Sequence, residues 1–260
     1  MKPVLELKNV TVSFGGLKAV NDVSFTVYEG QIFGLIGPNG AGKTTVFNTI
    51  TGFYKPDKGD ILFYGESIIG KPTWLVTRKG ISRTFQNIRL FKNLTVLDNI
   101  RIALHRSVQY ALWDAGTHMT NRFQSHEEEV FNTSLELLKQ ANLYEEKDKN
   151  ASQLPYGKQR RLEIARALAL KPKLLLLDEP AAGMNPTETM ELARYILDIR
   201  KELGIPIFLI EHHMDLVMAI CEDVAVMDFG VKIAQGRPEL IKKDPKVISA
   251  YLGQEVEAGA

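Results

Sequence analysis

The stretch from Gly37 to Thr44 combines glycines, a lysine and a threonine at a spacing suited to binding phosphate. Its order of glycine, four residues, glycine, lysine and a hydroxyl residue is that of the phosphate-binding loop. Glycine lets the backbone turn several N–H groups toward one phosphate, and a helix that starts at the lysine adds the positive end of its dipole. The loop therefore predicts binding of ATP or GTP through Gly37, Pro38, Asn39, Gly40, Ala41, Gly42, Lys43 and Thr44.

The side chains at the end of this loop are expected to have separate roles. Lys43 should reach the β- and γ-phosphates, the Thr44 hydroxyl should ligate Mg²⁺, and Thr45 should touch the α-phosphate. The competing interpretation is a glycine-rich turn with an exposed lysine. A strand-like run before the loop and a helical run after it favour phosphate binding.

Two neighbouring carboxylates, Asp178 and Glu179, directly follow the apolar run 174–177. In an open α/β sheet, ligands bind at the carboxyl ends of the strands. A carboxylate in that place can hold Mg²⁺, and the next one can orient and deprotonate an attacking water. We therefore expect Asp178 to be a metal ligand and Glu179 the general base, rather than two acids in a solvated turn.

Apolar runs of strand length surround these motifs. Loose alternation predicts two N-terminal strands in an antiparallel ribbon, and a more buried strand precedes the phosphate loop. Continuous apolar runs in the second half are typical of a parallel sheet with helices between its strands. The predicted strands cover residues 4–14, 23–27, 31–36, 174–177, 207–210 and 224–227, and the predicted helices cover 43–50, 188–203 and 215–220.

The middle of the chain, residues 87–152, has no strand-like run. Residues 123–141 instead show a helical pattern whose apolar side chains share one face, with acidic residues near its start. The charged stretch 144–150 is expected to be a loop. This region therefore predicts a helical insertion within an α/β core.

The composition is that of an ordinary globular protein. The 260 residues include 32 Lys+Arg and 31 Asp+Glu, giving a net charge of +1, and 45% of them are hydrophobic. This balance lends no support to a nucleic-acid binder, which usually has a strong basic excess. The apolar runs are far shorter than the ~20 residues of a membrane-spanning helix, so a role at a membrane would need a spanning partner.

Further motifs follow the phosphate loop in an order that resembles the ATP-binding subunits of ABC transporters, over about residues 4–252. The similar motifs are Arg83-Thr84-Phe85-Gln86 (Q-loop), residues 154–161 (signature loop), Asp178-Glu179-Pro180 (Walker B end), residues 182–186 (D-loop) and Ile210-Glu211-His212 (switch histidine). The resemblance implies an α/β P-loop NTPase (ABC ATPase) core with a parallel sheet, an N-terminal antiparallel β subdomain and an inserted α-helical subdomain. The core would be residues 1–86 and 160–254, the helical subdomain with the signature loop 87–159, and 255–260 a frayed tail.

The same resemblance implies roles for four more residues. Phe14 would stack on adenine, and Gln86 would contact both Mg²⁺ and the attacking water. His212 would hydrogen-bond the γ-phosphate and the general base. Gly157 would contact a phosphate bound by a second subunit. His213 beside His212 invites a metal interpretation, which we disfavour because neighbours on a strand face opposite sides.

The signature loop departs from the common family pattern Leu-Ser-Gly-Gly-Gln. Pro155 stands at the serine position and Tyr156 at the first glycine. Since proline has neither a hydroxyl nor a backbone N–H, the serine contact with the opposite γ-phosphate must be absent. We expect the Gly157 N–H and the following helix dipole to keep a weaker contact. Asn185 also replaces the usual D-loop aspartate.

Within the family, the chain is most similar to the LivG-type branch, which powers high-affinity import of branched-chain amino acids. Relatives in that branch import amides or urea. Two further functions compete with amino-acid import: the ATPase of a lipopolysaccharide exporter and a non-transport ABC ATPase. The non-transport proteins usually have two cassettes or a long coiled coil, and neither is present in this sequence.

The resemblance also implies partners: membrane permease subunits, a second ATPase subunit (a homodimer or a LivF-type heterodimer) and, indirectly, a periplasmic or extracellular solute-binding protein. The chain would work with Mg²⁺ and ATP at the cytoplasmic face of the inner membrane, without nucleic acid. Residues 105–123, which mix aromatic side chains with few charges, either dock on a permease or pack on their own subdomain.

Overall fold

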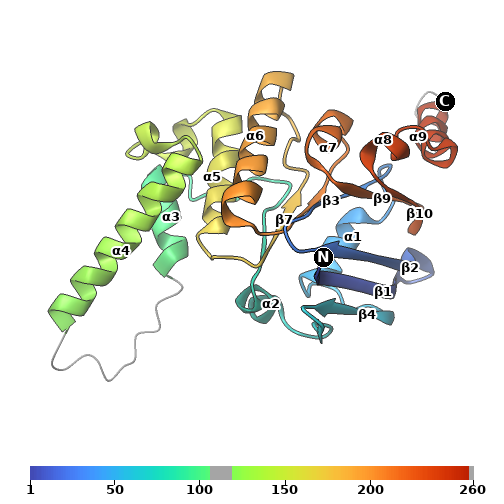
Figure 1. Ribbon diagram of the computed structural model, residues 1–260, viewed down its shortest axis with the longest axis horizontal. Helices are drawn as coiled ribbons and strands as arrows, with labels where there is room; N and C mark the ends of the chain where they lie inside the picture. Colours follow the sequence, from blue (N-terminus) through green and yellow to red (C-terminus); the bar gives the residue numbers. More distant parts are fainter. Residues whose placement is uncertain (106–118, 258–260) are drawn as a thin grey trace. The chain divides into compact units, whose positions relative to one another are not determined.

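The computed structural model describes residues 1–105 and 119–257 of the chain (Figure 1). The chain divides into two compact units. The first combines Met1–Gln86 with Lys173–Ala260, and the second is Asn87–Pro172, which extends past the signature loop to the end of the following helix. The segment considered for permease docking lies outside the described residues over 106–118.

The N-terminal strands form an antiparallel sheet in the first unit. β1 (Pro3–Phe14) and β2 (Leu17–Tyr28) pair over their length, which confirms the predicted ribbon. β4 (Lys58–Phe63) and β5 (Glu66–Ser67) complete the sheet in the order β2-β1-β4-β5. The hydropathy pattern does not indicate these last two short strands.

The second sheet of this unit carries the strands that precede the predicted site residues. Its neighbours are parallel except for the antiparallel pair β9–β10, so the sheet is mixed at one edge. Every residue of β3, β7 and β8 is buried, as expected for strands covered on both faces. The order is β10 (Val231–Gly236), β9 (Asp223–Asp228), β3 (Ile32–Ile36), β8 (Ile207–Ile210), β7 (Leu174–Asp178) and β6 (Ile81–Arg83).

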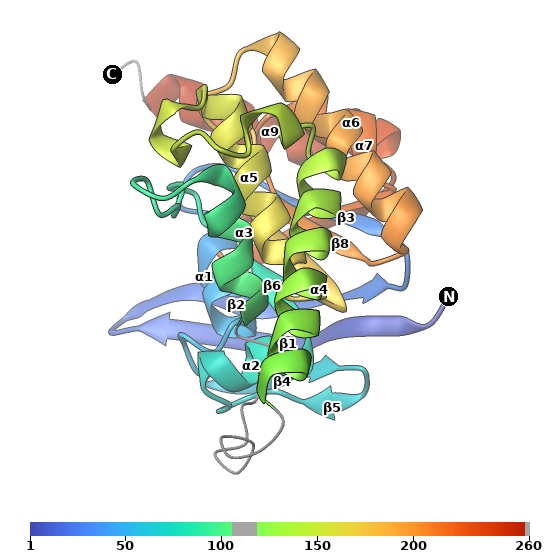
Figure 2. The same cartoon turned by 90° about the vertical axis from the view of Figure 1, so that its left-hand side faces the viewer.

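Helices cover both faces of this mixed sheet. In Figures 1 and 2, α1 lies between the two sheets, whereas α6 and α7 lie on the opposite side of the mixed sheet. One apolar core joins α1 to strands of both sheets, with Phe25, Phe33, Phe47 and Phe208 packed ring against ring. The helices of this unit are α1 (Lys43–Ile50), α2 (Thr73–Lys79), α6 (Pro186–Leu203), α7 (Met214–Ile220), α8 (Pro238–Ile241) and α9 (Pro245–Glu257). The backbone of α9 thus stays helical past the start of the expected frayed tail.

The second unit is helical, as the sequence predicts. It contains α3 (Val96–His105), α4 (Met119–Gln140) and α5 (Tyr156–Leu168), with two 3-10 turns at Tyr144–Glu146 and Ala151–Gln153. Over its described residues, the extended backbone amounts to an isolated bridge between Thr95 and Asn150. The stretch expected to be a loop therefore starts with a 3-10 turn.

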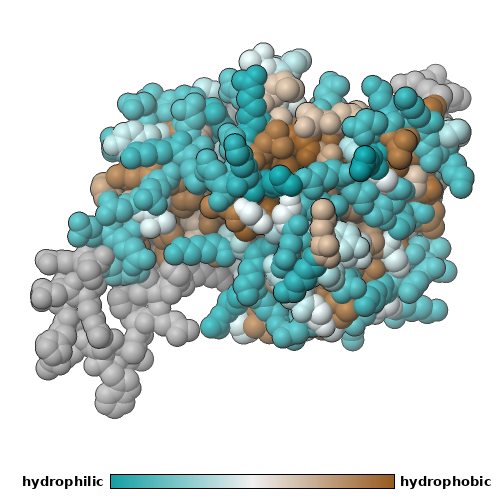
Figure 3. Space-filling view, in the orientation of Figure 1, coloured by the Kyte–Doolittle hydropathy of each residue, from teal (hydrophilic) through white to brown (hydrophobic). Residues whose placement is uncertain are grey.

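In the part of the chain that the structure describes, no helix has the length and apolar character needed to cross a membrane. The face of the molecule drawn in Figure 3 is mostly hydrophilic, with apolar side chains gathered in smaller patches.

Candidate active site

The phosphate loop connects β3 to α1 and has the conformation that only glycine allows at two positions. Gly37 (φ 147°) and Gly42 (φ 96°) both lie in the region of positive φ. A Cβ on Gly37 would stand 2.0 Å from the Met227 carbonyl oxygen, and one on Gly42 would stand 2.2 Å from that of Ala19. Any larger residue would push the loop away from β9 and β2, so these glycines fix the path of the loop.

Lys43 begins α1 and folds back over its own loop. Its ammonium donates hydrogen bonds to the carbonyl oxygens of Gly37 at 2.7 Å and Pro38 at 2.8 Å. Burial lowers the pKa of Lys43, and the nearby carboxylates of Glu179 and Asp178 act in the opposite direction. The ammonium therefore lies against its own loop. A bound phosphate could replace the two carbonyl oxygens as its hydrogen-bond acceptor.

The predicted metal ligand Asp178 ends β7 and forms an ion pair that sequence reasoning missed. Arg83 Nη2 donates to Asp178 Oδ2 at 2.6 Å, and both side chains are almost fully buried. Arg83 Nη1 donates to Asn48 Oδ1 at 2.8 Å and Thr51 Oγ1 at 3.2 Å at the end of α1. β6 spans only Ile81–Arg83, so the sequence carries no strand pattern that would place Arg83 beside the end of β7, where parallel neighbours end at one edge.

The three residues assigned to the chemistry of water lie around one carboxylate. Gln86 Nε2 donates to Glu179 Oε2 at 2.7 Å, and His212 Nδ1 lies 3.7 Å from the same oxygen. Glu179 has a positive φ of 44°, an unfavourable backbone conformation for this residue type that is found at active sites. The structure therefore brings Gln86, Glu179 and His212 together, although they are far apart in the sequence.

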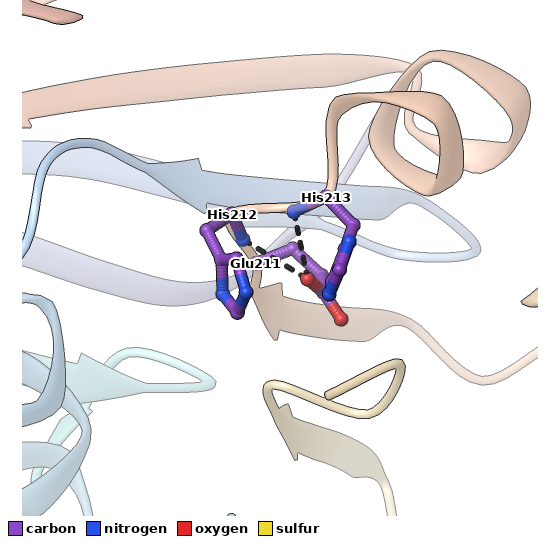
Figure 4. A group of neighbouring side chains, drawn as sticks. All are labelled: Glu211, His212 and His213. Carbon is purple, nitrogen blue, oxygen red and sulfur yellow. Dashed lines mark hydrogen bonds between the residues drawn. The ribbon is translucent and has the colours of Figure 1, made fainter. Parts of the chain in front are cut away.

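Glu211 is a buried hydrogen-bond centre beside this carboxylate. It is fully buried, and its side chain accepts the backbone N–H groups of His212 at 2.9 Å and His213 at 3.0 Å (Figure 4). It also accepts the Ala181 N–H at 2.8 Å. These bonds connect the turn that carries His212 to the chain just after Glu179. In the sequence Glu211 stands out only as part of a motif, because its burial depends on the packing of distant segments.

The expectation that His212 and His213 face opposite sides is wrong. β8 ends at Ile210, so the two histidines lie in a turn before α7, and their ring centroids are 4.3 Å apart. Together with Glu211 they offer ligand atoms within 4.8 Å of one another. Because the Glu211 oxygens already accept the three backbone N–H groups, this cluster is built as a hydrogen-bonded turn.

A pocket of about 290 Å³ opens over the phosphate loop. The loop residues 39–45 line one side of it and Glu179 contributes a carboxylate. Leu17, Ala19 and Phe229 supply apolar atoms to the same pocket. Among the described residues, Phe14 is not part of the lining; it is half exposed and packs edge-to-face on Tyr54, with ring centroids 5.0 Å apart.

The donors predicted for Mg²⁺ have suitable chemistry. The Thr44 hydroxyl, the Asp178 carboxylate and the Gln86 amide all offer hard oxygen atoms, which this ion prefers. Thr44 is exposed at the pocket, whereas Asp178 is held by Arg83. The donor set therefore fits Mg²⁺.

In the second unit, the signature loop leads directly into α5. Pro155 is the N-cap residue, and α5 begins at Tyr156, so the helix already includes Gly157 instead of beginning after it as expected. The N–H groups of Tyr156 and Gly157 thus lie in the first turn, where helical N–H groups have no intrahelical acceptor. Arg160 lies in the second turn, is fully buried and forms an ion pair with Glu163 at 2.7 Å. Its charge is therefore paired within α5.

Asn185 caps the helix after the D-loop. Its side-chain oxygen accepts the Glu188 N–H at 2.9 Å, and the Glu188 carboxylate accepts the Asn185 N–H at 3.1 Å. This reciprocal capping box explains why asparagine suits the position in place of aspartate, since both residue types are good N-caps.

Known proteins have sequences similar to this chain. The family described as "ABC transporter" matches residues 20–182, and that described as "Branched-chain amino acid ATP-binding cassette transporter" matches residues 231–257. The chain is 47% identical to the high-affinity branched-chain amino acid transport ATP-binding protein BraF of Pseudomonas aeruginosa, over 97% of this chain and 99% of the relative. It is 45% identical to LivG of Escherichia coli K12, described in the same words, with the same coverage.

Solved structures that are similar to this chain are also ATP-binding cassettes. An ATP-binding cassette of an ABC transporter in its ADP conformation has a TM-score of 0.85 and 33% identity, over 97% of this chain and all of that one. A dimeric cassette in a post-hydrolysis state, bound to ADP and phosphate, has a TM-score of 0.74 and 25% identity, over 90% of this chain and 98% of that one.

Proposed function

Because the chain belongs to the ABC transporter family of ATPases, we propose that its ATP hydrolysis drives high-affinity import of branched-chain amino acids: leucine, isoleucine and valine. The observation that carries this proposal is the combination of near full-length identity to the two relatives with the match of residues 231–257. These two observations distinguish the import branch from the rest of the family, because the phosphate loop and the Walker B end are common to the whole family.

The chain would act as one part of a membrane complex. It would bind permease subunits at the cytoplasmic face of the inner membrane and pair with a second ATPase subunit, either a copy of itself or a sister chain. A solute-binding protein would deliver the amino acid to the permeases. The dimeric relative supports the pairing, and the net charge of +1 supports the expectation that nucleic acid is not a partner.

ATP hydrolysis would use residues of the first unit, in the phosphate loop and around Glu179. Lys43 would leave the Gly37 and Pro38 carbonyls to bind the β- and γ-phosphates, and the loop N–H groups would hold the phosphate oxygens. Glu179 Oε2 would take the proton of the attacking water, which Gln86 and His212 would orient from either side. Thr44, Gln86 and Asp178 would hold Mg²⁺, which when bound neutralises charge on the phosphates.

A variant that cannot bind phosphate identifies the transported solute, because uptake of that solute is lost. In cells whose own copy is replaced by Lys43→Ala, we expect uptake of labelled leucine, isoleucine and valine to fall about tenfold or more, because a charge-assisted contact with phosphate is lost. Uptake of acetamide and urea is the control. Loss of acetamide or urea uptake instead would assign the chain to the amide or urea importers of its branch. Normal uptake of all five solutes, with a weakened outer envelope, would favour lipopolysaccharide export.

The signature loop allows a gain-of-contact test. Pro155→Ser adds a hydroxyl that could reach a phosphate on the partner subunit, so we expect ATP-driven dimerisation to strengthen about tenfold. Pro155→Ala is the matched control, since it removes proline without adding the hydroxyl. Dimerisation is measured by analytical ultracentrifugation with ATP and compared with monomer stability, because serine is also a good N-cap for α5. Equal dimerisation of both variants and the wild type would contradict the idea.

A further inference from the structure

Phe229 occupies a position in the fold where an aromatic residue is unfavourable. β9 ends at Asp228 and β10 starts at Val231, so Phe229 and Gly230 form the two-residue turn between these strands. Their φ angles are 40° and 81°, as a type I′ turn requires. Asparagine, aspartate and glycine favour that conformation, whereas a bulky side chain with positive φ is an outlier.

The phenyl ring of Phe229 also gains nothing from packing within the chain. Phe229 is 83% exposed, far more than the other phenylalanines whose side chains the structure describes. An exposed aromatic ring on a strained backbone stabilises neither the turn nor the core. The position therefore needs an explanation outside the folding of this hairpin.

The turn is firmly fixed to the nucleotide site. The Gly230 N–H donates to the Ala41 carbonyl of the phosphate loop at 3.2 Å, and the Asn21 N–H donates to the Gly230 carbonyl at 2.8 Å. A Cβ on Gly230 would stand 3.0 Å from two carbonyl oxygens of β2, so the turn lies closely against that strand. The backbone that carries Phe229 is thus held in place beside the phosphate loop, although the ring itself is exposed.

Phe229 is the aromatic side chain among the described residues that line the pocket over the phosphate loop. Leu17 and Ala19 are its apolar neighbours in the lining, whereas Lys43 and Thr44 supply the polar groups suited to phosphates. A nucleotide bound by its phosphates at the loop needs an apolar surface for its base. We propose that Phe229 packs against the adenine base of bound ATP, as a contact additional to the one expected from Phe14.

The proposal rests on ATP binding at the phosphate loop, and the two are tested separately with two probes. ATP reports on the phosphates and the base, whereas inorganic tripolyphosphate reports on the phosphates alone. Base–aromatic stacking contributes enough that Phe229→Asn should raise the Kd for ATP about tenfold. The Kd for tripolyphosphate should stay unchanged, and Phe229→Trp should keep the affinity for ATP.

Calorimetry on the full-length chain with Mg²⁺ measures both constants. Asparagine suits the positive φ, so Phe229→Asn should keep or raise the thermal unfolding midpoint without nucleotide. Phe131→Asn, which removes a half-exposed phenylalanine of the second unit, is the control and should leave both constants unchanged. An unchanged Kd for ATP in Phe229→Asn, an equal loss for tripolyphosphate, or a tryptophan variant as weak as the asparagine variant would overturn the proposal. A wild-type chain that binds neither probe would instead contradict the proposed function.

Discussion

Glu179→Gln is expected to lower steady-state ATP hydrolysis by about 10²- to 10⁴-fold, because it removes the proposed general base without changing the shape of the side chain. An amide cannot take a proton from water at neutral pH. Its oxygen can still accept the Gln86 Nε2–H that Glu179 Oε2 accepts at 2.7 Å in the native structure. Binding of ATP should therefore persist, and the variant should accumulate the ATP-bound state.

Two measurements separate this effect from damage to the site. Phosphate release gives the turnover rate, and equilibrium binding gives the Kd for ATP, which should change less than about threefold if only the base is lost. Glu239→Gln, an acid in the first turn of α8 and distant in sequence from the site motifs, is the matched control. A Glu179→Gln variant that retains a tenth or more of the native rate would mean that another group takes the proton.

His212→Ala tests a smaller contribution to the same hydrolysis step. The His212 ring lies 3.7 Å from Glu179 Oε2, beyond a direct hydrogen bond, and it is the more exposed partner. Its loss should lower turnover less than the loss of Glu179 does. The difference between the two variants reports how far the histidine acts by orienting the base and the phosphate.

Local sequence patterns predicted much of the scaffold. The phosphate loop, α1 and the buried strands β3, β7 and β8 lie where their apolar runs and glycines placed them, because these elements are determined by residues close together in the chain. β4, β5, β6 and β10 were missed, since they are exposed or only partly buried and lack the continuous apolar run that marks β3, β7 and β8. The frayed tail expected from residue 255 was inferred from the Ala- and Gly-rich end of the chain, whereas the backbone of α9 is helical to Glu257.

In the candidate site too, residues of local motifs could be predicted, whereas contacts between distant segments could not. Lys43, Asp178 and Glu179 belong to contiguous motifs and could be named directly. The partners of these residues could not, because Arg83 reaches Asp178 across neighbouring strands and Glu211 bonds to Ala181 across 30 positions of sequence. The wrong orientation assigned to His213 came from treating His212 and His213 as neighbours on a strand, although β8 ends at Ile210. Sequence motifs thus identify the candidate reactive groups, whereas long-range packing determines which residues contact them.

The buried pair of Arg83 and Asp178 provides the second large expected effect. Removing one partner leaves an uncompensated charge in the interior, which typically costs about 3–5 kcal/mol of unfolding free energy. Arg83→Met should reach that range, because it also removes hydrogen bonds to Asn48 and Thr51 and ring contacts with Phe47 and Phe85. Urea unfolding of the nucleotide-free chain measures the loss.

A double-mutant cycle separates the charge from the lost packing. Asp178→Asn in the Arg83→Met background leaves no unpaired carboxylate, so the double variant should be more stable than Arg83→Met alone and the two losses should not add. Additive losses would show that Arg83 acts through α1 and its neighbouring rings rather than through Asp178. If the pair is coupled as the 2.6 Å contact indicates, the guanidinium holds the carboxylate in its orientation at the end of β7. The position of the metal ligand would then depend on Arg83, a residue that contributes no oxygen to the metal.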